Sequence, residues 1–113
     1  MTRFLTNEMN DVLTSDHLDM AKEIVRRKIF VGLTHDLEKS FGRFMNYLGW
    51  DQNVSQEERN CLSTYLSKGS NRNKHNVEEG SRGWMALRQK NMFDLELYDY
   101  VLQLYEEQSV LVK

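Results

Sequence analysis

A short apolar run, IFVGL at residues 29–33, restricts most strongly how this chain can fold. The run does not alternate, is rich in β-branched and aromatic residues, and is ended by the polar sequence THD. This pattern is typical of a strand covered on both faces, as in a parallel sheet between helices. Such a strand needs hydrogen-bonding neighbours on both sides, and no other segment has the pattern of a central strand. Two interpretations stay open: the chain is a piece of a larger α/β protein, or IFVGL is a buried helical segment of an all-helical bundle.

Helical patterns lie on both sides of this run. Thr14 and Ser15 are good N-cap residues for a helix over residues 16–28, whose apolar positions recur every three or four residues. Thr34 is expected to cap a second helix that reaches Leu48 and carries a strong apolar stripe. The members of the stripe are Leu37, Phe41, Phe44, Met45 and Leu48.

The second half of the chain predicts three more helices. Residues 56–66 (QEERNCLSTYL) and 81–90 (SRGWMALRQK) are expected to form short ones, and the absence of proline favours helices in general. A final helix over 91–108 begins at Asn91, with Asp94 placed to complete a capping box. Its stripe contains Leu97, Val101, Leu104, Gln108 and Leu111, with Tyr98 and Tyr105 expected in the core and Tyr100 at its rim.

Composition excludes several classes of protein. With 40% hydrophobic residues, 28% charged residues and a net charge of −2, the chain is an ordinary globular one with no electrostatic attraction to nucleic acid or an anionic membrane. The single cysteine, Cys61, cannot form an internal disulfide and is interpreted as a small buried hydrophobe. The three histidines show no metal-ligand spacing, so no metal site is predicted. No segment resembles a signal peptide or a membrane span.

The basic stretch SKGSNRNKHN, residues 67–76, has the strongest claim to contact a ligand. Lys68, Arg72 and Lys74 supply cations, and Ser70 and Asn71 supply hydrogen-bond donors. Phosphate and sulfate groups require such charge-assisted donors. A solvated surface loop would have the same composition, and the chain lacks the GxxxxGK[ST] pattern of a phosphate-binding loop.

Three segments in this order resemble Golgi-type carbohydrate sulfotransferases, the group that contains the heparan sulfate and uronyl 2-O-sulfotransferases and related algal and protist proteins. HLDMAKEIVRRKIFVGLTHDLEKSF (17–41) is similar to that family's late helix, strand and helix, although His35 stands where the family commonly has Glu. SKGSNRNKHN occupies the place of its basic loop, and NMFDLELYDYVLQLYEEQ (91–108) is similar to its closing helix.

The resemblance implies an α/β fold. Residues 1–113 would form a single partial domain, the C-terminal part of a P-loop-kinase-like sulfotransferase domain, mostly helical with one buried strand. The full-length protein would transfer a sulfuryl group from 3'-phosphoadenosine 5'-phosphosulfate to a carbohydrate hydroxyl. By carry-over, Ser70, Asn71, Arg72 and Lys74 would bind the donor's 3'-phosphate, with Lys68 assisting.

Other parts of such an enzyme have no counterpart in the sequence. The loop that binds the donor's 5'-phosphosulfate is missing, no catalytic base is identified, and this segment alone is expected to be inactive. By resemblance the full-length protein would act on the lumenal side of the Golgi membrane, held by an anchor that this chain does not contain. The alternative is a small helical module that binds other proteins and catalyses nothing.

Overall fold

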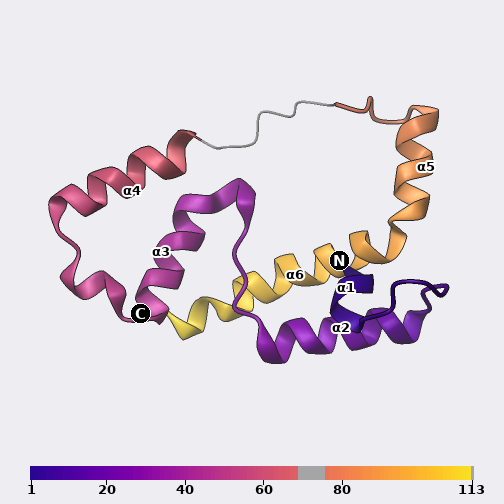
Figure 1. Cartoon of the computed structure of the whole chain (residues 1–113), viewed down its shortest axis with the longest axis horizontal. Helices are drawn as coiled ribbons and strands as arrows, with labels where there is room; N and C mark the ends of the chain where they lie inside the picture. Colours follow the sequence, from indigo (N-terminus) through magenta and orange to yellow (C-terminus); the bar gives the residue numbers. More distant parts are fainter. Residues whose placement is uncertain (69–75, 113) are drawn as a thin grey trace. The chain divides into compact units, whose positions relative to one another are not determined.

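The computed structural model describes residues 1–68 and 76–112, and these residues contain helices and no strand (Figure 1). The predicted α/β fold with one buried strand is therefore wrong, and the fold is all-helical over the described part of the chain. The α-helices are α1 (Thr2–Thr6), α2 (Ser15–Lys28), α3 (Leu37–Tyr47), α4 (Gln56–Lys68), α5 (Arg82–Lys90) and α6 (Met92–Glu107). Short 3-10 helices are η1 (Thr34–Asp36), η2 (Trp50–Asn53) and η3 (Gln108–Leu111).

The chain divides into two compact units. Unit 1 contains Met1–Ile29 and His75–Leu104, and unit 2 contains Phe30–Lys74 and Tyr105–Lys113. Helix α6 supplies residues to both units, because its last turn belongs to unit 2.

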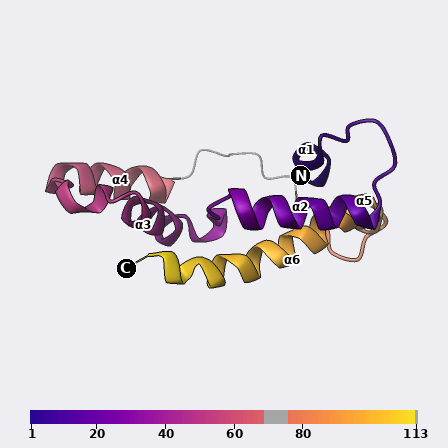
Figure 2. The ribbon, with the colours of Figure 1, turned by 90° about the horizontal axis from the view of Figure 1, so that it is seen from below.

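In unit 1, α1 packs against α2, and α2 lies beside the first part of α6 in both ribbon views (Figures 1 and 2). The predicted stripes supply the core, whose buried side chains are Leu18, Ala21, Val25, Leu97 and Leu104. Thr14 is the N-cap residue of α2, as predicted, and its backbone N–H donates to Nδ1 of His17 at 3.0 Å. The apolar periodicity predicted these core residues correctly, because α2 and the first part of α6 bury their apolar faces.

Asp94 holds α1 to the start of α6. Its Oδ1 accepts from the backbone N–H of Thr2 at 2.8 Å and from the Thr2 hydroxyl at 2.7 Å, and Thr2 is fully buried. Burial raises the pKa of Asp94, but the hydrogen bonds from Thr2 and the Met1 ammonium group outweigh it and hold the pKa below its ordinary value. Asp94 therefore joins two helices that are far apart in sequence, whereas the sequence predicted only a local cap.

In unit 2, the predicted strand is an extended segment without strand neighbours. Ile29 and Leu33 have extended backbone angles, and Val31 and Leu33 are buried. Side chains take the place of a neighbouring strand: the Val31 N–H donates to Oε1 of Gln108 at 2.8 Å, and the Leu33 N–H donates to Oγ of Ser40 at 2.8 Å. Because these groups satisfy the buried backbone, the run needs no sheet. IFVGL itself is neither a strand nor a helix, although the all-helical fold of the second interpretation is confirmed for the described residues.

Tyr105 is the centre of unit 2 and is 2% exposed, as the sequence predicted. Arg43 of α3 lies over its ring, 4.0 Å from the centroid, and donates from a guanidinium nitrogen to the Tyr105 carbonyl at 2.7 Å. Oγ of Ser40 lies 3.4 Å from the Tyr105 hydroxyl. Tyr98 is 42% exposed, so its predicted place in the core is wrong.

Candidate functional site

Helix α3 is the most informative element because its apolar face is only partly covered by the extended segment at residues 30–32. Leu37, Phe41, Phe44 and Leu48 follow one another at intervals of four, three and four residues, the spacing of a seam that pairs with another helix. Leu37 is 42% exposed, Phe44 40% and Leu48 39%. The only buried residue of α3 is Ser40, which lies one turn before Phe44 at the edge of the same face. We call these four residues the α3 seam.

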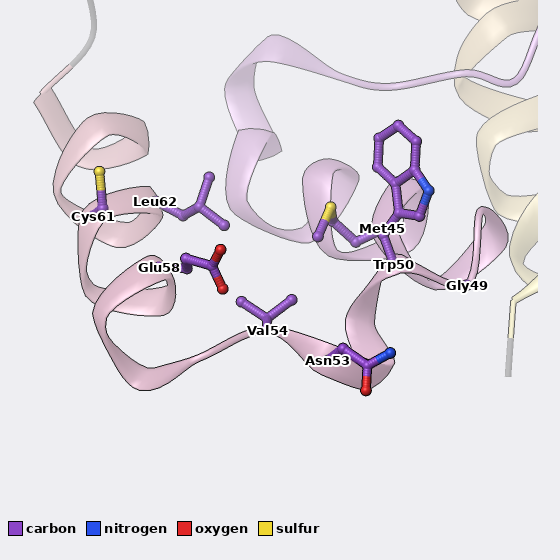
Figure 3. Close-up of a pocket in the computed structure, with 8 residues that line it drawn as sticks. All are labelled: Met45, Gly49, Trp50, Asn53, Val54, Glu58, Cys61 and Leu62. Carbon is purple, nitrogen blue, oxygen red and sulfur yellow. The ribbon is translucent and has the colours of Figure 1, made fainter.

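Beside the seam, α3, η2 and α4 enclose an apolar cavity of about 520 Å³. Leu62 of α4 and Val54 of the connection point into it toward Met45 of α3 (Figure 3). A second cavity of about 310 Å³ adjoins the first at these three residues and extends along α3 and α4 toward Phe41 and Leu66. We refer to the two cavities together as the α3–α4 groove. The first cavity is lined by Met45, Gly49, Trp50, Asn53, Val54, Glu58, Cys61 and Leu62.

Aromatic rings connect the seam to the groove. Phe44 lies 6.4 Å from Phe41 and 6.0 Å from Trp50, whose ring meets it edge-on at 89°. The Trp50 side chain is 59% exposed. Exposed aromatic side chains at the edge of an apolar groove are the residue types that carry most binding energy in protein interfaces.

Carboxylates dominate the charged side chains of the groove. Glu38, Asp51 and Glu58 line it, and Arg59 is the one cation among the described residues that line it. The backbone N–H and the hydroxyl of Ser55 bind Glu58 and lower the pKa of its carboxyl, so Glu58 is ionised at neutral pH. Oδ2 of Asp51 accepts from Asn46 at 2.8 Å, while its buried Oδ1 has no hydrogen-bond partner among the described residues.

The predicted donor-binding residues Ser70, Asn71, Arg72 and Lys74 lie outside the described residues. Lys68, the residue predicted to assist them, is the exposed last residue of α4. The structure therefore neither brings these side chains together nor separates them, and their role stays a prediction.

Cys61 is an exposed free thiol that lines the groove, so its predicted burial is wrong. Within residues 1–68 and 76–112, no cluster of three or more His, Cys, Asp or Glu side chains could hold a metal ion. In the same residues, no helix combines the length and apolarity needed to cross a membrane.

Sequence reasoning found the seam but missed the groove. The stripe of α3 was visible in the sequence, and a stripe of this kind usually faces a core. The signal that could have qualified this interpretation is Ser40, a polar residue one turn before Phe44 whose hydroxyl binds the backbone of Leu33. This contact places the Ser40 edge of the helix in the core of unit 2 and leaves Leu37, Phe44 and Leu48 half-exposed.

Comparisons with known proteins give no relative: no protein-family model, no curated protein and no solved structure matches the chain. Function is therefore argued from the geometry of the chain alone.

Proposed function

We propose that this chain is a helical protein-interaction module that binds an amphipathic helix of another protein in the α3–α4 groove. The observation that carries the proposal is the open α3 seam, which is apolar, helical and only partly covered in unit 2. Exposed apolar patches rimmed by polar residues commonly mark interaction sites. A helix that enters such a groove places its own apolar residues at spacings of three and four against it.

The energetics favour a ligand of this kind. Covering the half-exposed seam residues and Trp50 would contribute about 1 to 2 kcal/mol per side chain, before the cost of association is subtracted. Summed over the five side chains, this gross gain is roughly 5 to 10 kcal/mol, and the association cost reduces it to a weak affinity, nearer the millimolar than the micromolar range.

Few of the side chains that line the groove are suited to catalysis. Cys61 and Ser63 are its thiol and hydroxyl nucleophiles, and no histidine is among the described side chains that line either cavity. Neither side chain has a hydrogen bond to a general base of the kind that activates a catalytic nucleophile among the contacts of the described residues. Binding without chemistry therefore accounts best for the groove.

The test uses Trp50 and Cys61 of the protein itself as reporters of binding. Cys61 is the only cysteine, and a Trp84→Phe variant leaves Trp50 as the only tryptophan. An amphipathic peptide of about 18 residues, long enough to form a helix and free of Cys and Trp, is titrated into this variant. We expect the Trp50 emission to change with saturation and the alkylation of Cys61 to slow by at least about fivefold, because the peptide covers both side chains.

The matched variants are Phe44→Gln and Tyr65→Gln. Both replace an exposed aromatic residue with glutamine, and neither residue lines the two cavities. Phe44, however, belongs to the seam and its ring contacts Phe41 and Trp50, which do line them, whereas Tyr65 lies outside the seam. Phe44→Gln should weaken binding about tenfold, as for a central aromatic contact, and Tyr65→Gln should leave it unchanged. A peptide of the same composition in scrambled order should not protect Cys61. Equal protection by the ordered and scrambled peptides would contradict the proposal.

The carbohydrate sulfotransferase activity stays a prediction from the sequence. Its proposed donor contacts, Arg72 and Lys74, can be tested by titrating 3'-phosphoadenosine 5'-phosphate into the protein and into an Arg72→Ala, Lys74→Ala variant. Saturable binding that the variant loses would support the prediction, and equal affinity in the two proteins would remove the assignment of the loop.

A further inference from the structure

The charges that line the groove constrain the partner more than its apolar residues do. Glu38 lies in the first turn of α3, Asp51 in η2 and Glu58 in the first turn of α4, so the carboxylates come from three elements around one cavity system. Helix dipoles favour acids at these positions, which explains why they are stable there. Their charges nevertheless act on whatever enters the groove. We call these three residues the acidic rim.

We infer that the partner helix is basic: its apolar residues face the α3 seam and its flanking lysine or arginine residues meet the acidic rim. The inference rests on the proposed function, because it specifies the ligand of the same groove. The carboxylates are partly fixed in place, since Glu58 is bound to Ser55 and Asp51 to Asn46. Groups held in position lose less freedom when a cation binds, and complementary charge also selects against acidic partners.

The experiment compares three helical peptides that share one apolar seam. They carry Lys, Gln or Glu at the flanking positions of the heptad and are titrated into the Trp84→Phe protein, with Cys61 alkylation as the second readout. At low salt we expect the Lys peptide to bind about eightfold to about a hundredfold more tightly than the Gln peptide, from roughly two- to fivefold for each of the three rim carboxylates. The Glu peptide should bind most weakly. At about 0.5 M salt, where the Debye length is about 4 Å, the three affinities should converge.

Removing the charges of the rim carboxylates shows whether the flanking lysine residues of the peptide bind them. A Glu38→Gln, Glu58→Gln variant should lose most of the preference for the Lys peptide while it keeps its affinity for the Gln peptide. The matched control is Asp19→Asn, Glu96→Gln, which removes the same number of charges from exposed positions in unit 1 and should keep the preference. A preference that survives in the rim variant would overturn the inference.

The remaining outcomes separate the inference from the proposed function. Equal binding of the three peptides, or tightest binding of the Glu peptide, would overturn the inference and leave the groove as a helix-binding site. Failure of every peptide to protect Cys61 would remove the proposed function itself.

A second copy of the chain is the other possible occupant, since α5 is basic and exposes Met85 and Leu87. Sedimentation of the protein without peptide tests it. Self-association that Arg88→Gln, Lys90→Gln abolishes would make the second copy the ligand and overturn the inference of a separate partner.

Discussion

At the scale of single residues, unit 2 shows how side chains can replace a sheet. Gln108 and Ser40 accept hydrogen bonds from Val31 and Leu33, so an extended apolar segment is buried without strand neighbours. The strand prediction was wrong for this reason: the apolar pattern predicted the extended conformation of residues 29–33 but not the groups that satisfy their backbone. Those groups come from residues as far away as position 108.

Replacing the Gln108 side chain tests this role. Gln108→Leu removes the acceptor and leaves the buried Val31 N–H without it, so the free energy of unfolding should fall by about 1 to 3 kcal/mol. Urea denaturation followed by Trp50 fluorescence in the Trp84→Phe background measures it. Gln89→Leu, at an exposed position of α5, should change stability by less than about 0.5 kcal/mol. Equal effects of the two substitutions would show that the Gln108 contact is not structural.

Asp94 makes unit 1 sensitive to acid. Its pKa is lowered in the folded chain, so its contribution is complete above the pKa of an unfolded aspartate and is lost as the pH falls through the lower folded value. Asp94→Asn should cost about 1 kcal/mol at neutral pH, a value reduced because the side chain is 35% exposed. The difference between the two proteins should disappear in acid, as measured by denaturation followed by Trp84 fluorescence in a Trp50→Phe background. A constant difference at every pH would contradict this account.

At the scale of elements, the sequence predicted where the helices lie but not which elements they pack against. The predicted helices at 16–28, 56–66 and 81–90 correspond to α2, α4 and α5, because caps and apolar periodicity are local signals. The helix expected to begin at Thr34 is a 3-10 turn followed by α3, whose N-cap is Asp36. Whether a stripe is covered depends on distant residues. The stripe of α2 is buried and that of α3 is open, although the two patterns are alike in sequence.

The open seam predicts unusual tolerance to polar substitution. Leu48→Gln should cost less than about 1 kcal/mol, because the side chain is already half in water. Leu33→Ala, in the buried part of the same unit, should cost about 2 to 3 kcal/mol. Thermal or urea denaturation of the two variants compares them directly. A larger loss for Leu48→Gln than for Leu33→Ala would mean that the seam is part of the core.

At the scale of the whole molecule, each unit combines a small core with exposed apolar side chains on several of its elements. In unit 2, α3 and η2 carry Leu37, Phe44, Tyr47, Leu48 and Trp50, next to the acidic rim. Composition predicted an ordinary globular protein but could not show this distribution, since the same residues would give the same totals if the seam were buried. The sequence therefore predicted the apolar stripe of α3 but not its exposure. That exposure depends on the contacts that Ser40 makes with Leu33 and Tyr105 in unit 2.

The central claim is that a helical ligand binds along α3, η2 and α4. The most direct measurement is a map of backbone amide chemical-shift changes when the Lys-flanked peptide is titrated into the isotope-labelled protein. We predict that the largest changes fall between residues 37 and 62, the range that contains the seam and most of the groove lining. Changes concentrated instead in α1, α2 or α5, or saturating binding that leaves residues 37–62 unchanged, would contradict the account.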